Sequence, residues 1–294
     1  MFRIGILGSE NSHAMAFAKI FNGLDPNFEG SFPDCKVVAI GGHYPESSQK
    51  VFDECGLEFI AEKPEDMLGN VDAVMVTARN GKFHPEFARP FIESGIPAFI
   101  DKPFANDGAE ALALAKLAKS KNVPLVGGSS TKLVYDVTML RNSFKNGLGG
   151  LLGGGVAAPL SFNNEYGGFY FYSSHLAEIL MAIFGYDVKS VIAVEKNGNV
   201  TGIARYNDLD VTMHFNDGYY GYSAGMFGKK GSARREIDIS LCYQHECQIF
   251  ADMLRTGKMS HTYEELIAPV FLLNAIEKSY LNGGQEVPVI IPEV

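Results

Sequence analysis

Residues 1–13 read MFRIGILGSENSH, in which a run of apolar and β-branched residues from Phe2 to Leu7 leads into a glycine and then into polar residues. A buried strand that ends in a glycine turn just before a helix is typical of the first βα unit of a dinucleotide-binding domain. In such a unit, main-chain N–H groups and the positive end of the helix face an anion such as a diphosphate. The residues predicted to form this cofactor-binding turn are Gly8, Ser9, Glu10, Asn11 and Ser12.

The glycine turn departs from the usual G-x-G-x-x-G pattern. Gly8 fits the first glycine, but Glu10 stands at the second glycine position and His13 at the third. An ordinary strand-to-helix turn, capped by Asn11 or Ser12, is therefore an alternative to a phosphate-binding turn.

The end of the predicted second strand offers a further test of the cofactor. An NAD site normally has Asp or Glu there to bind the ribose 2′-hydroxyl, whereas this chain has Gly41, Gly42, His43 and Tyr44. His43 and Tyr44 are suited to stacking on adenine, and the imidazole of His43 also to binding a 2′-phosphate, which slightly favours NADP over NAD. A solvated loop explains the same residues, so the sequence leaves the choice of cofactor open.

Strand and helix patterns alternate over the first 126 residues. The strand patterns are continuous apolar runs, as expected for parallel strands covered on both faces. The predicted strands are 2–7, 36–40, 57–60, 71–77, 96–100 and 123–127, and the predicted helices are 12–24, 46–55, 84–94 and 108–119. These elements predict an α/β domain over residues 1–126, with a Rossmann-type parallel sheet.

The pattern changes after about residue 127. Residues 210–216 alternate between apolar and polar side chains, as in an antiparallel sheet covered on one side. Further strands are predicted at 189–195, 200–206, 219–226 and 234–240, and helices at 174–184, 244–256 and 264–282. Residues 127–294 are therefore predicted to form an α+β domain built on a largely antiparallel open sheet.

Charge and hydropathy exclude several classes of function. The chain has 294 residues and a formal charge of −9, from 34 acidic and 25 basic residues. No basic patch is evident, so nucleic acid is not expected as a partner. The longest uncharged stretch, residues 147–162, contains six glycines and a proline. We therefore expect no membrane span.

The cysteines predict neither a disulfide framework nor a metal site. Four cysteines, at 35, 55, 242 and 247, are too sparse and irregular for a disulfide-stabilised fold. Cys242, His245 and Cys247 offer only three ligands without a spaced partner pair, so zinc is not predicted. The N-terminus lacks the pattern of a secretory signal. These features together predict a reduced, cytoplasmic protein.

The clearest local signal of a site is FIDKP, residues 99–103. It places Asp101 and Lys102 at the carboxyl end of a predicted strand, and ligands of open α/β sheets bind outside that edge. Pro103 fixes the backbone just beyond the lysine. A surface salt bridge is the alternative explanation of this pair.

Several stretches together resemble the Gfo/Idh/MocA family of oxidoreductases. They are RIGILG (3–8), VDAVMVTARN (71–80) followed by HPE (84–86), and ESGIPAFIDKP (93–103), whose DKP is similar to the Glu-Lys-Pro motif of the family. The resemblance continues through residues 167–178 and 246–257 to the glycines at 283 and 284. It implies an N-terminal Rossmann domain and a C-terminal domain whose open sheet often forms an oligomer interface. It also implies NAD(P)-linked oxidation or reduction of a sugar, a polyol or a related hydroxyl compound.

The resemblance also suggests which residues act. Lys102 matches the active-site lysine of the family, and His175 matches the histidine of its Asp-x-x-x-His element. The aspartate of that element falls on Phe171, which can neither accept a proton nor orient an imidazole. The spacing from Asn80 to His84 is one residue longer than usual. Further residues placed at the cofactor by the resemblance are Thr77, Arg79 and Asp101.

Hydride transfer from a carbinol carbon needs a base for the hydroxyl proton and a positive group for the developing alkoxide. Lys102 suits the second role and His175 the first. With Ser173 or Ser174 as the N-cap, His175 would lie in the first turn of a helix, whose dipole disfavours an imidazolium. A capping or interface histidine is the alternative.

The aromatic residues before His175 are further candidates for the substrate site. Tyr170 or Tyr172 is a possible substitute for the missing aspartate, and the run from Tyr166 to Tyr172 suits either a wall that stacks on a sugar or simple packing.

Three hypotheses follow from the sequence. The leading one is a dehydrogenase or reductase that uses NAD or NADP on a small, sugar-like substrate and assembles as a homo-oligomer, a dimer or tetramer, through its C-terminal sheet. The second is a catalytically degenerate family member that binds a small molecule or regulates. The third is a non-redox transformation that uses tightly held NAD transiently.

Overall fold

The computed structural model describes the backbone of residues 1–294 and the side chains of residues 1–143 and 147–294. Its N-terminal part is a six-stranded sheet in the order β3-β2-β1-β4-β5-β6. The strands are β1 (Phe2–Leu7), β2 (Cys35–Gly41), β3 (Phe59–Ala61), β4 (Ala73–Val76), β5 (Ala98–Asp101) and β6 (Leu125–Gly128), and all neighbours are parallel. This is the dinucleotide-binding strand order, with the topological switch between β1 and β4. The predicted Rossmann-type sheet is confirmed.

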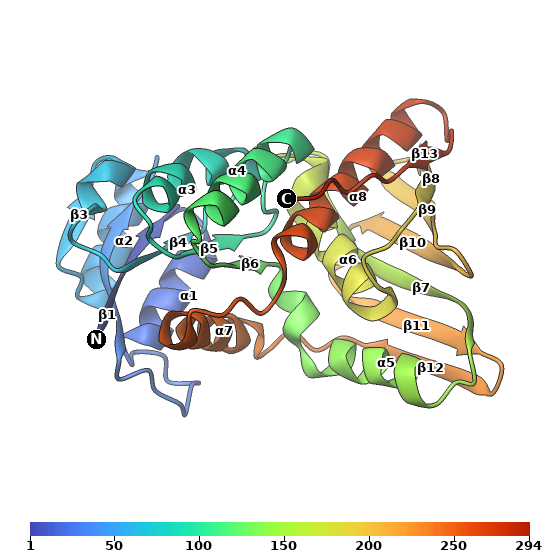
Figure 1. Ribbon diagram of the computed structural model, residues 1–294, viewed down its shortest axis with the longest axis horizontal. Helices are drawn as coiled ribbons and strands as arrows, with labels where there is room; N and C mark the ends of the chain where they lie inside the picture. Colours follow the sequence, from blue (N-terminus) through green and yellow to red (C-terminus); the bar gives the residue numbers. More distant parts are fainter.

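Helices cover both faces of this sheet (Figure 1). On one face lie α1 (Ser12–Phe21), α2 (Pro45–Cys55) and α7 (Cys242–Thr256), and on the other lie α3 (His84–Glu93), α4 (Gly108–Lys121) and the first part of α8 (Tyr263–Leu281). Short 3-10 helices are η1 (Pro64–Met67), η2 (Gly81–Phe83) and η3 (Ser130–Leu133). Helices α7 and α8 come from the C-terminal half of the chain, so that half completes the core of the N-terminal sheet.

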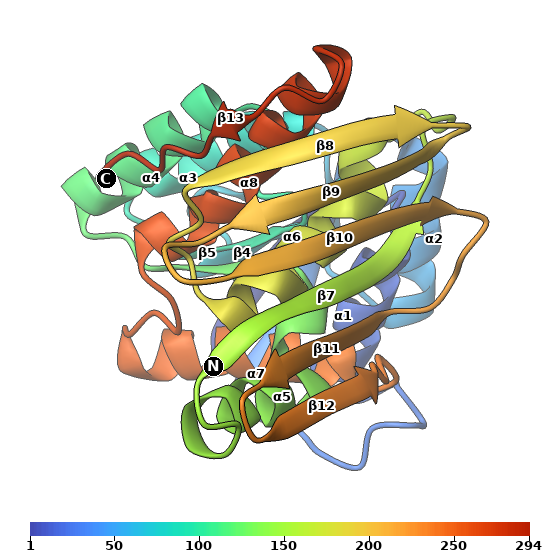
Figure 2. The ribbon, with the colours of Figure 1, turned by 90° about the vertical axis from the view of Figure 1, so that its right-hand side faces the viewer.

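The C-terminal part is a seven-stranded sheet in the order β12-β11-β7-β10-β9-β8-β13. Its strands are β7 (Leu151–Leu160), β8 (Ser190–Lys196), β9 (Asn199–Arg205), β10 (Asp210–Asp217), β11 (Ser223–Gly228), β12 (Gly231–Glu236) and β13 (Val287–Pro288). All neighbours are antiparallel except β7 and β10, which are parallel. Helices α5 (Tyr135–Asn146), α6 (Phe169–Phe184) and α8 lie behind the sheet, and its other face is uncovered (Figure 2). The predicted open, largely antiparallel sheet is confirmed.

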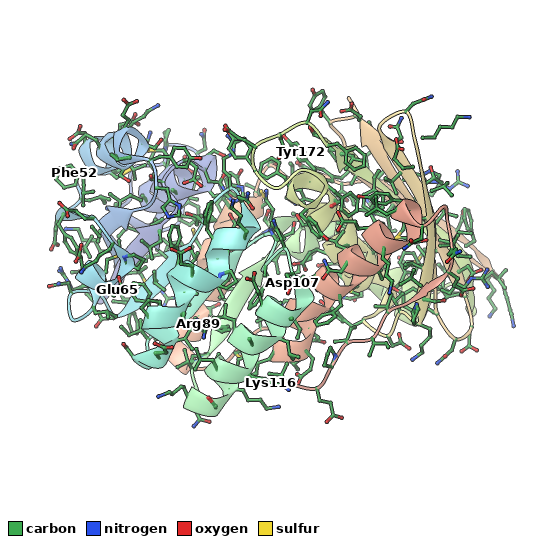
Figure 3. The ribbon with its side chains drawn as sticks, turned by 90° about the horizontal axis from the view of Figure 1, so that it is seen from above. Phe52, Glu65, Arg89, Asp107, Lys116 and Tyr172 are labelled. Carbon is green, nitrogen blue, oxygen red and sulfur yellow. The ribbon has the colours of Figure 1, made fainter. Side chains whose placement is uncertain are left out.

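Helix α4 illustrates how local sequence sets an element boundary. The Asp107 carboxylate accepts hydrogen bonds from the main-chain N–H groups of Ala109 and Glu110, which caps the first turn. Asn122 ends the helix in the left-handed conformation. The exposed Lys116 points away from the sheet on the outer side of this helix (Figure 3).

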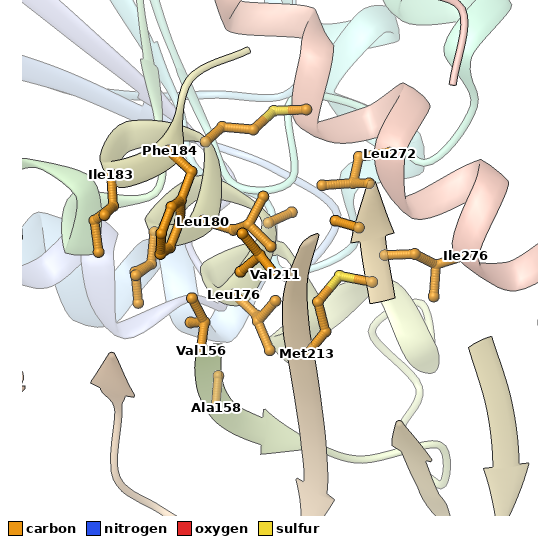
Figure 4. Close-up of a cluster of buried hydrophobic side chains, with 14 of the residues drawn as sticks. Val156, Ala158, Leu176, Leu180, Ile183, Phe184, Val211, Met213, Leu272 and Ile276 are labelled. Atoms are coloured by element: carbon orange, nitrogen blue, oxygen red, sulfur yellow. The ribbon is translucent and has the colours of Figure 1, made fainter. Parts of the chain in front are cut away.

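The core of the C-terminal domain lies between α6 and its sheet (Figure 4). Strand β10 alternates as predicted, with Val211, Met213 and Phe215 buried beneath the helices. Strand β7 runs beside it although three consecutive glycines, residues 153–155, weaken its strand propensity. A Cβ at Gly154 would lie 2.4 Å from the Phe184 ring, so the glycine lets α6 approach the sheet closely.

Helix α6 begins at Phe169, five residues earlier than predicted. Phe169 and Phe171 are buried, so their packing extends the helix toward its N-terminus. Ser173 and Ser174 therefore lie inside the helix rather than at its N-cap, and His175 lies in the second turn. The prediction that a first-turn dipole keeps His175 neutral is wrong, and another cause of neutrality is described below. No helix in the described chain has the length and apolar character needed to cross a bilayer.

Candidate active site

The turn after β1 is pressed against the end of β4. Gly8 has φ +105°, and a Cβ there would lie 2.1 Å from the main-chain nitrogen of Ala78. The Thr77 hydroxyl donates a hydrogen bond to the Gly8 carbonyl oxygen at 3.0 Å. Glycine is thus required at position 8 by the packing of the turn itself, and Thr77 fixes the turn from within the protein.

The remaining residues of the turn also bond to neighbouring loops. The Ser9 hydroxyl donates to the Tyr44 carbonyl oxygen at 3.3 Å, and Glu10 Oε1 accepts from the main-chain N–H of Arg79 at 2.8 Å. The Asn11 side chain caps α1, as the sequence suggested. His43 is exposed, and its ring packs edge-on against Phe83, with 4.5 Å between the ring centroids.

Asp101 is completely buried behind the turn. Its Oδ2 lies 2.6 Å from His13 Nδ1 and accepts from Asn11 Nδ2 at 3.2 Å, and its Oδ1 accepts from the main-chain N–H of Lys102. Burial opposes ionisation of this carboxyl, but His13 and the Lys102 ammonium outweigh it and hold the pKa of Asp101 below its ordinary value. Asp101 therefore supports the turn and α1 from inside, and does not face a ligand directly.

A cavity of about 200 Å³ lies at the carboxyl ends of the parallel strands, against α6 and the start of α7. It brings together six residues that the sequence predicted for the site: Asn11, Ser12, Arg79, Lys102, Tyr172 and His175. Other polar residues that line it were not predicted, namely His13, Ser130, Thr131, Tyr222, Cys242 and Tyr243.

Lys102 is almost fully buried, with 3% of its surface exposed. Its Nζ lies 3.4 Å from the Phe171 carbonyl oxygen and 4.0 Å from the centroid of the Phe171 ring. Burial lowers the pKa of Lys102 to about 8; Asp101 opposes this shift and Arg79 adds to it. The ammonium is therefore present at neutral pH and titrates only slightly above it.

His175 reaches the same cavity from α6. Its Nδ1 lies 2.6 Å from the Ser129 hydroxyl oxygen, which in turn lies 2.7 Å from the Thr131 hydroxyl oxygen. Burial first, and then the Lys102 charge, lower the pKa of His175 well below its ordinary value. The imidazole is therefore neutral at pH 7, because of desolvation and a neighbouring cation rather than a helix dipole.

The main chain at Ser129 is hydrogen-bonded to Glu178, which belongs to a buried ion pair. Glu178 Oε1 accepts from the Ser129 main-chain N–H at 3.0 Å, and Glu178 Oε2 lies 2.9 Å from Lys132 Nζ. A Cβ at Gly128 would lie 2.1 Å from Glu178 Oε1, so the chain passes close to this pair only with glycine there. The orientation of His175 thus depends on a hydrogen-bonded support that runs from α6 to the end of β6.

Comparison with a family model agrees with the dinucleotide-binding fold of the N-terminal sheet. Residues 2–128 match the family model GFO_IDH_MocA, described as an oxidoreductase family with an NAD-binding Rossmann fold. This match covers the whole six-stranded sheet, from β1 to β6. No curated protein sequence matches the chain significantly.

Solved structures of inositol dehydrogenases share the fold over the whole chain. Myo-inositol 2-dehydrogenase from Lactobacillus plantarum has 17% identity and a TM-score of 0.84, with 98% of this chain and 99% of that chain covered. Scyllo-inositol dehydrogenase from Lactobacillus casei, with bound NAD(H) and scyllo-inositol, has 16% identity and a TM-score of 0.82, with 98% and 99% covered. Myo-inositol dehydrogenase from Corynebacterium glutamicum has 17% identity and a TM-score of 0.80, with both chains fully covered. At these identities the likeness establishes a common fold.

The N-terminal domain of this chain offers a set of groups that fit a dinucleotide. The switch point between β1 and β4, the Gly8 turn at positive φ and a cation-lined cavity beside them are the features such a ligand requires. Glu10 replaces the second glycine, but its carboxylate is bonded to the Arg79 N–H rather than left free toward a diphosphate.

Phe171, which stands at the aspartate position of the Asp-x-x-x-His element, contacts Lys102 through its aromatic ring. Two cations lie near the Phe171 ring, whose centroid is 4.0 Å from Lys102 Nζ and 5.3 Å from the Arg79 guanidinium carbon. Aromatic faces attract cations at these distances. Phe171 therefore positions Lys102 through its ring and its carbonyl oxygen, although it cannot exchange a proton.

Tyr170 does not reach the cavity. Its hydroxyl donates to Glu277 Oε2 at 2.5 Å and accepts from Asn274 Nδ2 at 2.8 Å, both on α8. Residues two positions apart on a helix point in different directions, so Tyr172 lines the cavity while Tyr170 packs toward the C-terminal core. The structure thus separates the two tyrosines that the sequence offered as substitutes for the missing aspartate.

Two residues that the sequence analysis missed are central to the geometry. His13 occupies the third glycine position, and its significance emerges only when Asp101 is placed beside it. Ser129 belongs to a polar run at 129–131 that follows β6, and polar residues after a parallel strand are a signal of a site that the sequence did offer. No cluster of potential metal ligands is present among the described side chains.

Proposed function

We propose that this chain is an NAD(P)-dependent oxidoreductase that acts on a hydroxyl or carbonyl group of a sugar, a polyol or a related compound. The observation that carries the proposal is the meeting of Lys102 and His175, both buried, in one cavity at the carboxyl edge of a Gfo/Idh/MocA Rossmann sheet. The shared fold with inositol dehydrogenases supports a polyol as the substrate class.

The two side chains have complementary chemistry. When His175 Nδ1–H donates to the Ser129 hydroxyl, the lone pair of Nε2 is available to take the proton of a substrate hydroxyl. The Lys102 ammonium stabilises the alkoxide that develops, and when a carbonyl is reduced the protonated His175 returns its proton to the oxygen. The nicotinamide ring, when bound, supplies the site that accepts or donates the hydride.

The cofactor is proposed to lie along the turn and the neighbouring strand ends. Main-chain groups of residues 8–12 would hold the diphosphate, with Thr77 maintaining the shape of the turn. NAD(H) is the cofactor named for the family. The absence of a carboxylate at residues 41–44 and the presence of His43 favour NADP slightly, and the dissociation constants of both cofactors distinguish the two.

We also propose that copies of the chain associate through the uncovered face of the C-terminal sheet. A sheet face without helices exposes side chains such as Val194 and Phe227 in a single chain. Light scattering coupled to size-exclusion chromatography measures the mass in solution, and a monomer would contradict this proposal.

A turnover assay tests the proposed function. The purified protein is incubated with NAD⁺ or NADP⁺ and a panel of polyols, sugars and sugar acids, and reduced nicotinamide is followed by its absorbance. We expect turnover with at least one compound, and a loss of about a hundredfold or more in kcat for Lys102→Ala. Binding of a sugar without binding of any nicotinamide dinucleotide would instead support a small-molecule-binding protein, which Glu10 in the phosphate turn also favours.

A further inference from the structure

Arg79 lies between two adjoining cavities. It lines the cavity that holds Lys102 and His175, and it also lines a second cavity of about 240 Å³ next to β7 and the loop after β10. Phe171 and Tyr172 line both cavities as well. Together the two volumes fall in the range of about 300–1,000 Å³ that is usual for small-molecule sites.

The guanidinium of Arg79 is held in place by aromatic rings and not by a carboxylate. Its central carbon lies 3.9 Å from the centroid of the Tyr166 ring and 5.3 Å from that of Phe171. None of the ion pairs among the described side chains includes Arg79, and Glu10 accepts from the Arg79 main-chain N–H. The Arg79 Nε is buried and has no hydrogen-bond acceptor. A buried donor without an acceptor is costly, and a ligand that supplies the acceptor removes the cost.

The charge of the cavity that holds Lys102 and His175 also favours a ligand with a hydrogen-bond acceptor, in particular an anion. Its basic side chains are His13, Arg79, Lys102 and His175, and no carboxylate lines it in the described structure. Asp101 lies behind the wall, where His13 and Asn11 occupy its Oδ2. The proposed function assigns Lys102 to the developing alkoxide, so the Arg79 guanidinium is available for another negative group.

We propose that the substrate of the enzyme carries a carboxylate, as in a sugar acid or a polyhydroxy acid, and that Arg79 binds this carboxylate while the reacting hydroxyl meets Lys102 and His175. This inference rests on the proposed function, whose substrate class it narrows. A planar guanidinium forms two parallel hydrogen bonds to a carboxylate, which fixes the substrate as well as attracting it. A phosphate of the cofactor would offer the same chemistry, and the experiment separates these two sources.

The experiment compares matched neutral and acidic compounds. Dissociation constants for glucose and glucuronate, and for galactose and galacturonate, are measured by calorimetry with the wild-type protein, with and without saturating NADH. The affinities for NADH and NADPH are measured separately. The variants are Arg79→Gln and, as a matched control, Lys82→Gln, which removes an exposed cation from the adjacent 3-10 helix. Arg79→Lys serves as the conservative variant, and the melting temperature verifies folding.

We expect the acid of at least one pair to bind about tenfold or more tightly than its neutral partner to the wild type, because a hydrogen bond to a charged group has this magnitude. Arg79→Gln should remove the preference, Arg79→Lys should retain part of it, and Lys82→Gln should leave it unchanged within about twofold. Equal binding of acid and neutral partner in both pairs would overturn the proposal. It would also be overturned if Arg79→Gln weakened NADH binding and left the sugars unaffected, since the anion would then be a phosphate of the cofactor.

The two proposals fail in different ways. Absence of binding of both NADH and NADPH together with Arg79-dependent binding of an acid would overturn the oxidoreductase function but support the carboxylate site. NADH binding and turnover without any preference for acids would support the oxidoreductase function and overturn the carboxylate site.

Discussion

Replacing Lys102 by methionine is expected to stabilise the protein at neutral pH while abolishing turnover. The ammonium is almost fully buried and has only the Phe171 carbonyl oxygen within hydrogen-bond distance among the described groups. Its pKa is lowered from 10.5 to about 8, chiefly by burial. At 1.36 kcal/mol per pKa unit, the charged form costs about 3 kcal/mol. Methionine has a similar length without the charge, so the free energy of unfolding at pH 7 should rise by up to about 3 kcal/mol.

The pH dependence of this effect has a definite sign. Between pH 8 and 10.5 the unfolded chain still binds a proton at Lys102 that the native protein has released, so the stability of the wild type rises with pH in this window. The advantage of methionine should therefore shrink from about 3 kcal/mol at pH 7 to nearly zero above about pH 10.5. Urea unfolding of both proteins from pH 7 to pH 10.5 measures the difference.

An exposed lysine supplies the control. Lys116 lies on the outer surface of α4, and Lys116→Met should change stability by less than about 0.5 kcal/mol at any of these pH values. A Lys102→Met protein that is less stable than the wild type at pH 7, or a difference that does not vary with pH, would refute the reasoning that burial of the ammonium opposes folding.

Three further substitutions have expected outcomes. Gly8→Ala introduces a Cβ 2.1 Å from a main-chain nitrogen and should lower the free energy of unfolding by about 3 kcal/mol or more. The control is Gly95→Ala, where no atom lies within 4 Å of the new Cβ and the loss should be only about 1–2 kcal/mol. Equal losses in chemical unfolding would contradict the packing argument. Ser129→Ala removes the partner of His175 Nδ1, so kcat should fall about tenfold at nearly constant KM, and an unchanged kcat would exclude a positioning role. Both carboxylate oxygens of Glu246 are buried without a hydrogen-bond partner, and burial and Asp101 raise the pKa of this carboxyl well above 4.5. The free energy of unfolding of the wild type should therefore fall as pH rises from 4.5, and Glu246→Met should remove that fall. A Glu246→Met protein that is less stable than the wild type at pH 7 would disprove this reasoning.

The parallel sheet could be predicted because its signal is local. Each strand is a short apolar run bounded by turn residues, and β1 from Phe2 to Leu7 coincides with its prediction. Strand β7 and the start of helix α6, in the C-terminal domain, lack such a signal. Strand β7 contains three consecutive glycines, and its place between β10 and β11 is stabilised by pairing and by contact with α6 rather than by its own residues. Helix α6 starts at Phe169 because tertiary burial extends it beyond the serines that usually cap.

Site residues could be predicted where they follow directly on a strand. They could not be predicted where their role depends on contacts with residues distant in sequence. Lys102 follows β5, and the resemblance to a family identified it together with His175. The bond between His13 and Asp101 joins residues 88 positions apart, and that between Ser129 and His175 joins residues 46 apart. No spacing rule connects such pairs, since only the folded sheet brings the strand ends and α6 together.

Titration of the purified protein with NADH, followed by the fluorescence of the nicotinamide, tests most directly whether this cavity serves hydride transfer. The account predicts saturable binding that NAD⁺ or NADP⁺ displaces, together with a melting temperature that rises with ligand concentration. Absence of saturable binding by all four nicotinamide dinucleotides at millimolar concentration would contradict it.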